Sequence, residues 1–263
     1  MADRSTAGWS VAEVTVEGGA DLVAWLEAEG PARGADWAIT PAANRRKRLL
    51  ISDMDSTIIG QECLDELADF AGLKAEVSAI TERAMRGELD FASALTQRVA
   101  MLKGLNLAAL DACHRERVRL NPGARELVAT MKAHGARAVL VSGGFRYFTS
   151  RVAIMAGFDA DRANTLIDDG AALTGAVGQP ILGREAKLIA LLEETAALGL
   201  GANDAVALGD GANDLDMIRA AGLGIAYKAK QIVAAETRAR IEHTDLRAAL
   251  FFQGYAASEI VSA

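Results

Sequence analysis

Two short clusters of carboxylates define the chemistry that this chain can perform. Asp53 and Asp55 directly follow one short apolar run, and Asp210 and Asp214 directly follow another. Apolar runs of this length are typical of buried parallel strands, and α/β proteins bind their ligands beyond the carboxyl ends of such strands. We therefore expect the two clusters to meet at one edge of a sheet.

Carboxylates gathered at one sheet edge repel one another unless a cation lies among them. Mg²⁺ is the usual solution, because it binds one or two carboxylates together with phosphate and water. We expect one Mg²⁺ in the site, held by the Asp53 carboxylate, the Asp55 backbone carbonyl and Asp210. Asp214 is expected to orient a lysine or a metal-bound water. An oxygen-only site of this kind also accepts Mn²⁺.

Asp53 and Asp55 also suit the two roles that hydrolysis of a phosphate ester requires. This reaction is among the slowest known without a catalyst, so dividing it into two easier displacements is an advantage. Asp53 is expected to attack phosphorus and form an aspartyl-phosphate. Asp55 lies two residues further on and points the same way at a strand end. It is expected to protonate the leaving oxygen and later to take a proton from water.

A serine, two glycines and a lysine elsewhere in the chain complete the predicted phosphate site. A carboxylate that approaches a phosphate dianion is repelled, so positive charge and hydrogen-bond donors must be in place beforehand. Ser142 and the backbone N–H groups of Gly143 and Gly144, expected at a helix start, can bind phosphate oxygens. Lys187, on a predicted helix, can neutralise developing charge.

The elements that must position these residues alternate between strand and helix from about residue 121. This alternation predicts an α/β fold with a Rossmann-like parallel sheet and helices on both faces. Residues 163–177, on either side of Asp169-Gly170, predict a small antiparallel hairpin that forms a flap. The predicted strands are 48–52, 137–141, 205–208 and 224–227, and the predicted helices are 122–134, 147–156, 187–192 and 215–221.

Residues 61–120 carry a different pattern, with apolar residues every three or four positions, which predicts helices throughout. Inserted after the first core strand, on the side of the carboxylates, this region is expected to cover the site as a helical cap domain. Residues 46–60 and 121–263 are assigned to the catalytic core. Residues 1–45 are assigned to a short N-terminal extension or partial regulatory domain. The basic run 45–48 is interpreted as a solvated approach to the first strand.

Composition excludes several classes of protein. A chain of 263 residues with a net charge of −7 is not expected to bind nucleic acid or an anionic membrane. Its start lacks a secretion signal and no long apolar segment follows, so we expect a cytoplasmic protein with a small-molecule substrate. Cys63 and Cys113 lack metal-site spacing and are expected to be free buried thiols. The composition leaves open whether the protein is a monomer or a homodimer.

From residue 46 to about residue 250, these motifs resemble those of the haloacid dehalogenase superfamily. One family within it, the bacterial phosphoserine phosphatases, is similar in the cap as well as the core, at residues 53–57, 81–91, 142–145 and 209–214. The resemblance implies Mg²⁺-dependent hydrolysis of O-phospho-L-serine through an aspartyl-phosphate, the last step of serine biosynthesis. Many relatives carry a longer N-terminal domain, so regulation by serine through such a domain is not implied here.

The same resemblance implies the residues that recognise the substrate. Glu62 and Arg98 would bind the ammonium and carboxylate groups of the amino acid. Met85 and Phe91 would line the pocket, and Asn213 would contribute a further contact.

Two alternatives remain open at the level of sequence. A related phosphatase or phosphotransferase could act on another small phosphomonoester, such as a sugar phosphate or phosphohomoserine, because the core motifs do not define the leaving group. A non-catalytic phospho-acceptor also clusters aspartates at strand ends, but it needs neither an acid/base such as Asp55 nor a cap. Glu62 and Arg98 favour a zwitterionic substrate.

Overall fold

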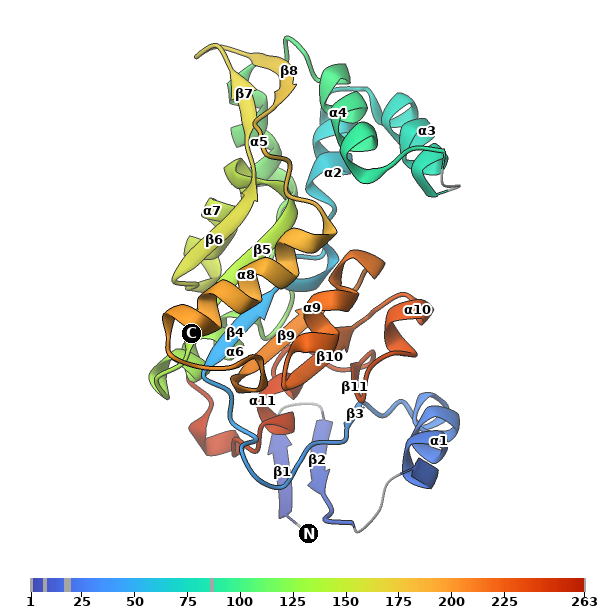
Figure 1. The fold of residues 1–263 in the computed structure, drawn as a ribbon, viewed down its shortest axis with the longest axis vertical. Coiled ribbons are helices and arrows are strands. Elements are labelled where there is room, and N and C mark those ends of the chain that lie inside the picture. Colours follow the sequence, from blue (N-terminus) through green and yellow to red (C-terminus); the bar gives the residue numbers. More distant parts are fainter. Residues whose placement is uncertain (1, 7–8, 17–19, 86–87, 263) are drawn as a thin grey trace.

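The computed structural model describes residues 2–6, 9–16, 20–85 and 88–262. The predicted Rossmann-like sheet is confirmed (Figure 1). All neighbouring strands in it are parallel except the first pair, which is antiparallel. Within these residues the sheet has seven strands, in the order β3 (Trp37–Ala38), β11 (Ala239–Ile241), β10 (Leu223–Tyr227), β9 (Ala205–Gly209), β4 (Leu49–Ser52), β5 (Arg137–Phe145) and β6 (Ala160–Asn164).

The middle strand β4 brings the two carboxylate clusters together. It is fully buried between β5 and β9, with Ser52 level with Leu140 and Leu208. The backbone N–H of Asp53 donates to the carbonyl of Leu208 over 3.0 Å, so the pairing continues to the ends of both strands. Because β4 and β9 run parallel, the acids that follow each strand emerge at the same edge.

Helices cover both faces of the sheet, because its central strands are apolar on both sides. Leu50 and Val206 pack into the core on one face, whereas Leu49 and Ile51 pack on the other, with the two-residue period of a strand. The first face carries α6 (Ala124–Ala133), α7 (Arg146–Ala156) and α11 (Ala248–Phe252), and the second carries α8 (Arg184–Ala197), α9 (Leu215–Ala220) and α10 (Gln231–Ala234).

No helix among the described residues combines the length and the apolar character needed to cross a membrane.

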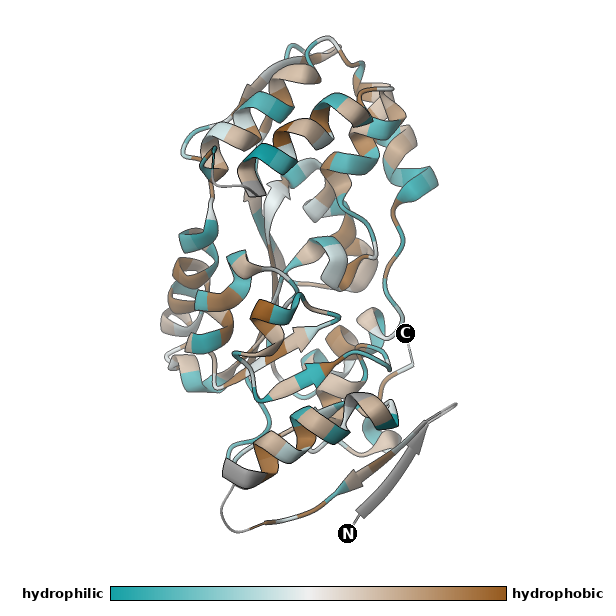
Figure 2. Ribbon diagram, turned by 90° about the vertical axis from the view of Figure 1, so that its right-hand side faces the viewer, coloured by the Kyte–Doolittle hydropathy of each residue, from teal (hydrophilic) through white to brown (hydrophobic). Residues whose placement is uncertain are grey.

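A group of helices from residues 63–117 forms the opposite end of the molecule from the N-terminus (Figure 1). Figure 2 shows the same division from a second direction, with this helical part at the top and the sheet below it. The apolar positions of the helices at 63–70, 91–101 and 107–117 join the main core, which explains their period of three to four residues. The helices are α2 (Cys63–Phe70), α3 (Lys74–Met85), α4 (Phe91–Met101) and α5 (Leu107–Arg117).

The predicted antiparallel hairpin is present beside these helices and is formed by β7 (Leu166–Asp168) and β8 (Leu173–Val177). Three backbone hydrogen bonds join it to the loop between α4 and α5. The N–H of Gly104 donates to the carbonyl of Leu173 over 2.8 Å, and the N–H of Leu173 donates to the carbonyl of Leu105 over 2.9 Å. The third bond runs from the N–H of Leu107 to the carbonyl of Ala171 over 3.0 Å.

The sheet differs from the prediction at the end of β5 and in three strands, β3, β6 and β11, that the sequence analysis did not predict. β5 continues through Gly143 and Gly144 to Phe145, and α7 begins only at Arg146. The two glycines therefore lie in an extended strand and not at a helix start, and the pairing register with β6 shifts over this stretch. The strand β6 is absent from the sequence prediction, because its polar residues lack the apolar alternation that indicates a strand.

The basic run at 45–48, interpreted as a solvated approach to the first strand, is exposed at Arg46 and Arg48 but ties distant segments together through Arg45 and Lys47. Arg45 donates to the Glu13 carboxylate over 2.7 Å. The ammonium group of Lys47 donates to the carbonyl of Asn203 over 2.8 Å, and its side chain is buried. Residue 13 belongs to a separate antiparallel pair, and the N-terminal elements are β1 (Ala2–Thr6), β2 (Trp9–Glu13) and α1 (Ala20–Glu29).

Candidate active site

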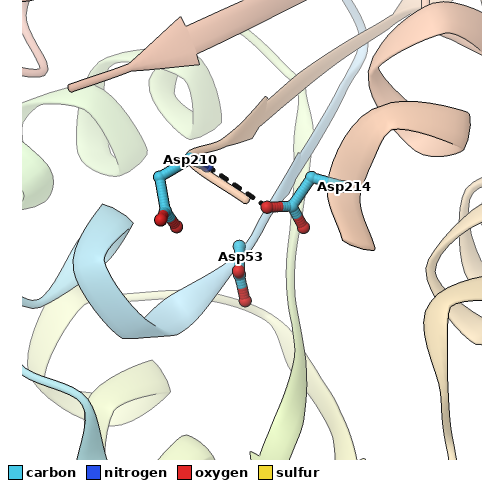
Figure 3. A group of neighbouring side chains, drawn as sticks. All are labelled: Asp53, Asp210 and Asp214. Atoms are coloured by element: carbon cyan, nitrogen blue, oxygen red, sulfur yellow. Dashed lines mark hydrogen bonds between the residues drawn. The ribbon is translucent and has the colours of Figure 1, made fainter. Parts of the chain in front are cut away.

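Three carboxylates meet where β4 and β9 end (Figure 3). Asp53 directly follows β4, Asp210 directly follows β9, and Asp214 ends a short 3-10 turn over residues 212–214. One oxygen atom from each carboxylate lies within 4.8 Å of the other two. The structure thus brings together acids from two distant parts of the sequence.

A buried lysine lies against two of these acids. The Nζ atom of Lys187, in the first turns of α8, is 2.8 Å from Oδ2 of Asp53 and 2.5 Å from Oδ1 of Asp214. Burial lowers the pKa of Lys187, but the two carboxylates outweigh that effect and raise it, so the ammonium group stays charged. Burial also raises the pKa of Asp53, and the charge of Asp214 adds to this while Lys187 opposes it.

The triad can hold a metal ion. Its donors are all oxygen, which hard divalent cations prefer. Three carboxylates face one ammonium group, so negative charge is in excess. Burial raises the pKa of Asp210 to about 6, with further contributions from the charges of Asp214 and Glu62, which is the direction expected of a carboxylate that lacks a neutralising partner.

The carboxylate of Asp214 already accepts hydrogen bonds from other groups of the protein. Besides the bond from Lys187, its Oδ2 accepts the backbone N–H of Asp210 over 3.2 Å and that of Gly211 over 3.0 Å. Gly209 permits this arrangement, because a Cβ at residue 209 would lie 2.5 Å from the Asp214 carboxylate. Asp214 therefore fixes both the lysine and the loop that carries Asp210.

Asp55 is held in place at both of its oxygens. Oδ1 accepts the backbone N–H of Cys63 over 2.9 Å, and Oδ2 accepts the hydroxyl of Ser142 over 3.2 Å. Burial and the charge of Glu62 together raise the pKa of Asp55 to about 6, while the Cys63 hydrogen bonds oppose the shift. A carboxyl group with this pKa can both give and take a proton near neutral pH.

The residues expected to bind phosphate surround Asp55 from the end of β5. The N–H of Gly144 donates to the Ser142 hydroxyl over 2.8 Å. A Cβ at residue 144 would lie 3.0 Å from both the Asp55 carboxylate and that hydroxyl. The strand therefore approaches the acid closely because position 144 carries no side chain. This close approach replaces the helix start that the sequence had predicted.

The two residues expected to recognise an amino acid are Glu62, directly before α2, and Arg98, on α4. Oε1 of Glu62 accepts the hydroxyl of Ser56 over 2.7 Å. Arg98 is half-buried on α4; burial lowers its pKa, and the charges of Asp65 and Glu62 act in the opposite direction. The charge of Glu62 therefore acts both on Arg98 and on the predicted acid/base Asp55.

The remaining predicted substrate residues have different positions. Phe91, at the start of α4, lies over β5, because a Cβ at Gly143 would be 3.2 Å from its Cζ atom. Asn213 lies over Gly211, where a Cβ would be 2.3 Å from the amide oxygen. The side chain of Met85, the last residue of α3, lies outside the described part of the structure.

Three site residues were missed by the sequence analysis. Ser56 binds Glu62, the backbone of Cys63 binds Asp55, and the buried hydroxyl of Thr57 donates to Asp210 over 3.3 Å. Ser56 and Thr57 directly follow the first acidic cluster, and this adjacency was the available signal. Nothing in the pattern distinguishes a backbone donor such as Cys63 from its neighbours.

Comparisons with known proteins agree with this geometry. The sequence matches the family model described as haloacid dehalogenase-like hydrolase over residues 50–219. It is 48% identical over 204 residues to a phosphoserine phosphatase of Polaromonas sp., a match that covers 76% of this chain and 86% of that protein.

Two similar solved structures are a HAD family hydrolase and a phosphoserine phosphatase. A HAD family hydrolase from Salmonella enterica serovar Typhi has a TM-score of 0.85 and 33% identity, covering 89% of this chain and 81% of the other. A phospho-aspartyl intermediate analogue of phosphoserine phosphatase has a TM-score of 0.72 and 38% identity, and the match covers 79% of this chain and 99% of the other.

Proposed function

Because the chain belongs to the haloacid dehalogenase-like hydrolase family, we propose that it hydrolyses O-phospho-L-serine to L-serine and phosphate. The observation that carries the proposal is the pair of carboxylates after β4, which occupy different environments. Asp53 contacts a buried ammonium group, whereas Asp55 accepts hydrogen bonds at both oxygens and has a raised pKa. Two neighbouring carboxylates in such different environments can take different roles, one as a nucleophile and the other as an acid/base.

Asp53 attacks phosphorus and forms an aspartyl-phosphate, while Asp55 gives a proton to the departing serine oxygen. In the second step Asp55 takes a proton from water as the water oxygen attacks phosphorus, which releases phosphate and restores the Asp53 carboxylate. Lys187 neutralises charge on the phosphate oxygens. Ser142 and Gly144, whose donors bind Asp55 and the Ser142 hydroxyl in this structure, would donate hydrogen bonds to phosphate once it is bound. A phosphoserine phosphatase 38% identical to this chain has been captured as an analogue of such an intermediate.

Asp53, the backbone carbonyl of Asp55 and Asp210 would hold Mg²⁺, and the excess negative charge of the triad supports this assignment. When bound, Mg²⁺ supplies positive charge opposite the phosphate oxygens. Asp214 does not need to bind the metal directly, because its oxygens already accept bonds from Lys187 and from the loop.

Glu62 would bind the ammonium group of the substrate and Arg98 its carboxylate, with Met85, Phe91 and Asn213 completing the pocket. The opposite charges of Glu62 and Arg98, which act on each other, support this assignment. Residues 61–120 act as a cap over the site, since Phe91 of this segment lies over Gly143 of the core. By closing over the bound substrate, the cap limits the access of bulk water to the site.

We assign the protein to the cytoplasm. Cys63 and Cys113 are both free and buried, which suits a reducing compartment. Fractionation of cells that express the tagged full chain tests the assignment, because recovery in any other fraction would contradict it.

Phosphate release from L-phosphoserine tests the proposed function directly. Activity is compared with that on sugar, nucleotide and aryl phosphates, with Mg²⁺ and with a chelator. We expect a metal-dependent preference for phosphoserine that is lost in Asp53→Asn. Equal activity across the panel would retain the aspartyl-phosphate chemistry but reject phosphoserine as the substrate. If none of the compounds is hydrolysed, the proposal that this protein is a phosphatase would be rejected.

A further inference from the structure

Glu62 is held by a side chain that the catalytic chemistry does not use. It occupies the N-cap position of α2, where an acidic side chain commonly accepts a backbone N–H of the first turn. Its carboxylate makes no such bond. Instead, Oε1 accepts the hydroxyl of Ser56 over 2.7 Å, and no hydrogen bond from another described residue reaches Oε2, which leaves that oxygen open to a ligand within this part of the chain. A bond between a hydroxyl and a carboxylate is among the stronger hydrogen bonds in proteins.

The position of Ser56 is itself fixed by the backbone. Its φ is +54°, in the left-handed region that residues with a side chain seldom adopt. Its N–H donates to the carbonyl of Gln61 over 3.1 Å, and the next tie along the loop joins Asp55 to the N–H of Cys63. Unfavourable backbone conformations of this kind persist where the surrounding structure enforces them, and they are concentrated at functional sites.

Glu62 needs such a tether because of its surroundings. Its charge acts on Asp55 and on Asp210, both acidic, and on the basic Arg98. The bond from the Ser56 hydroxyl fixes one oxygen of Glu62 among these opposing charges.

We propose that Ser56 is a positioning residue that fixes the Glu62 carboxylate for the ammonium group of an amino-acid phosphate. Ser56 thereby determines selectivity for amino-acid esters over other phosphate esters without touching phosphorus. This inference rests on the proposed function, because it takes Glu62 as the group that binds the substrate ammonium.

The test measures kcat and KM for L-phosphoserine and for p-nitrophenyl phosphate, which has neither an ammonium group nor a carboxylate. In Ser56→Ala we expect KM for phosphoserine to rise about tenfold, the order of one hydrogen bond to a charged group. The ratio of kcat/KM between the two substrates should fall to the same extent. Ser56→Gly should behave like Ser56→Ala, since it also removes the hydroxyl but accepts the positive φ without strain.

Ser150→Ala is the matched control, because the hydroxyl of Ser150 donates to a backbone carbonyl of its own helix, that of Arg146, over 2.7 Å. This variant should keep the selectivity ratio of the original enzyme. In a Glu62→Ala background, the effect of Ser56→Ala on KM should shrink below about twofold, because no carboxylate is left to position.

An unchanged selectivity ratio in both Ser56 variants would overturn the proposal. The proposal would also be overturned if Ser56→Ala still raised KM for phosphoserine in the Glu62→Ala background, because the effect would then not depend on the Glu62 carboxylate. Failure of the unaltered enzyme to prefer phosphoserine over the aryl ester is a separate result. It would reject the proposed function, and the role of Ser56 with it.

Discussion

The Nζ atom of Lys187 lies 2.8 Å from Oδ2 of Asp53, and both side chains are almost fully buried. Removal of the ammonium group would leave two buried carboxylates without their common partner. We predict that Lys187→Met lowers kcat for phosphate release by at least about 10³-fold, because a preorganised positive group at the reacting phosphate is lost. It should also reduce the free energy of unfolding by about 3 kcal/mol.

Rapid-quench kinetics and urea unfolding measure the two effects of Lys187→Met. Lys132→Met is the control, since Lys132 forms a more exposed ion pair with Asp159 at 2.6 Å and should change unfolding by less than about 1 kcal/mol. A Lys187→Met enzyme with normal kcat would show that positive charge at this position is not required.

Asp210→Asn should weaken metal binding without removing the nucleophile. Loss of one carboxylate ligand is expected to raise the Mg²⁺ concentration that gives half-maximal activity by about 10- to 100-fold. Excess Mg²⁺ should restore much of the activity, and a chelator should abolish it in both enzymes. Asp216→Asn, which alters an exposed acid paired with Arg184, should leave the Mg²⁺ requirement unchanged. Equal Mg²⁺ requirements for Asp210→Asn and the unaltered enzyme would contradict the assigned ligand.

Gly144→Ala should impair catalysis more than folding. The added Cβ would lie 3.0 Å from the Asp55 carboxylate and the Ser142 hydroxyl, so one of them must move. A displacement of this size at reacting groups costs about 100-fold in kcat. Gly201→Ala is the control, because a Cβ there meets no atom within 4 Å. Steady-state kinetics beside thermal unfolding would separate the effects, and normal kcat in Gly144→Ala would argue against close packing at the site.

Glu194 should make stability depend on acid pH. Burial raises its pKa, but hydrogen bonds from Arg137 and Arg162, each 2.7 Å long, outweigh burial and hold the pKa below its ordinary value of 4.5. A carboxylate with a depressed folded-state pKa adds stability above about pH 4.5, and this stability is lost as pH falls through the folded-state value.

Thermal unfolding of Glu194→Gln against the unaltered protein measures this contribution. The variant should be less stable at pH 7, by about 1 kcal/mol, and the difference should shrink below about pH 4. Glu193→Gln, in which a more exposed carboxylate loses its contact with Arg162, should show a smaller loss. A difference for Glu194→Gln that stays constant from pH 7 to pH 3 would contradict the pKa argument.

The sequence predicts the elements of this site better than their fine geometry. Asp53 and Asp210 could be placed together because each follows a buried apolar strand, and parallel strands end at a common edge. The strand β6 could not be found, since an edge strand with Asp161 and Arg162 resembles a loop in its composition. The helix start expected at Gly143 is an extended strand, because glycines permit either conformation.

Contacts between distant segments explain the rest of what the pattern could not supply. The buried position of Lys47 depends on the carbonyl of Asn203, which lies far along the chain. The hydrogen bond between Ser56 and Glu62 depends on the left-handed backbone conformation of Ser56, which cannot be predicted from the presence of a serine. Local propensity carries no information about either contact.

The three hydrogen bonds between the α4–α5 loop and the hairpin make the helical region and the hairpin a single mechanical unit. The chain enters and leaves this unit through two pairs of adjacent segments, one where Ile59 faces Leu120 and one where the N–H of Gly178 binds the carbonyl of Thr165. Any displacement of the α4–α5 loop relative to the sheet must therefore carry the hairpin with it, because the three hydrogen bonds join the two segments.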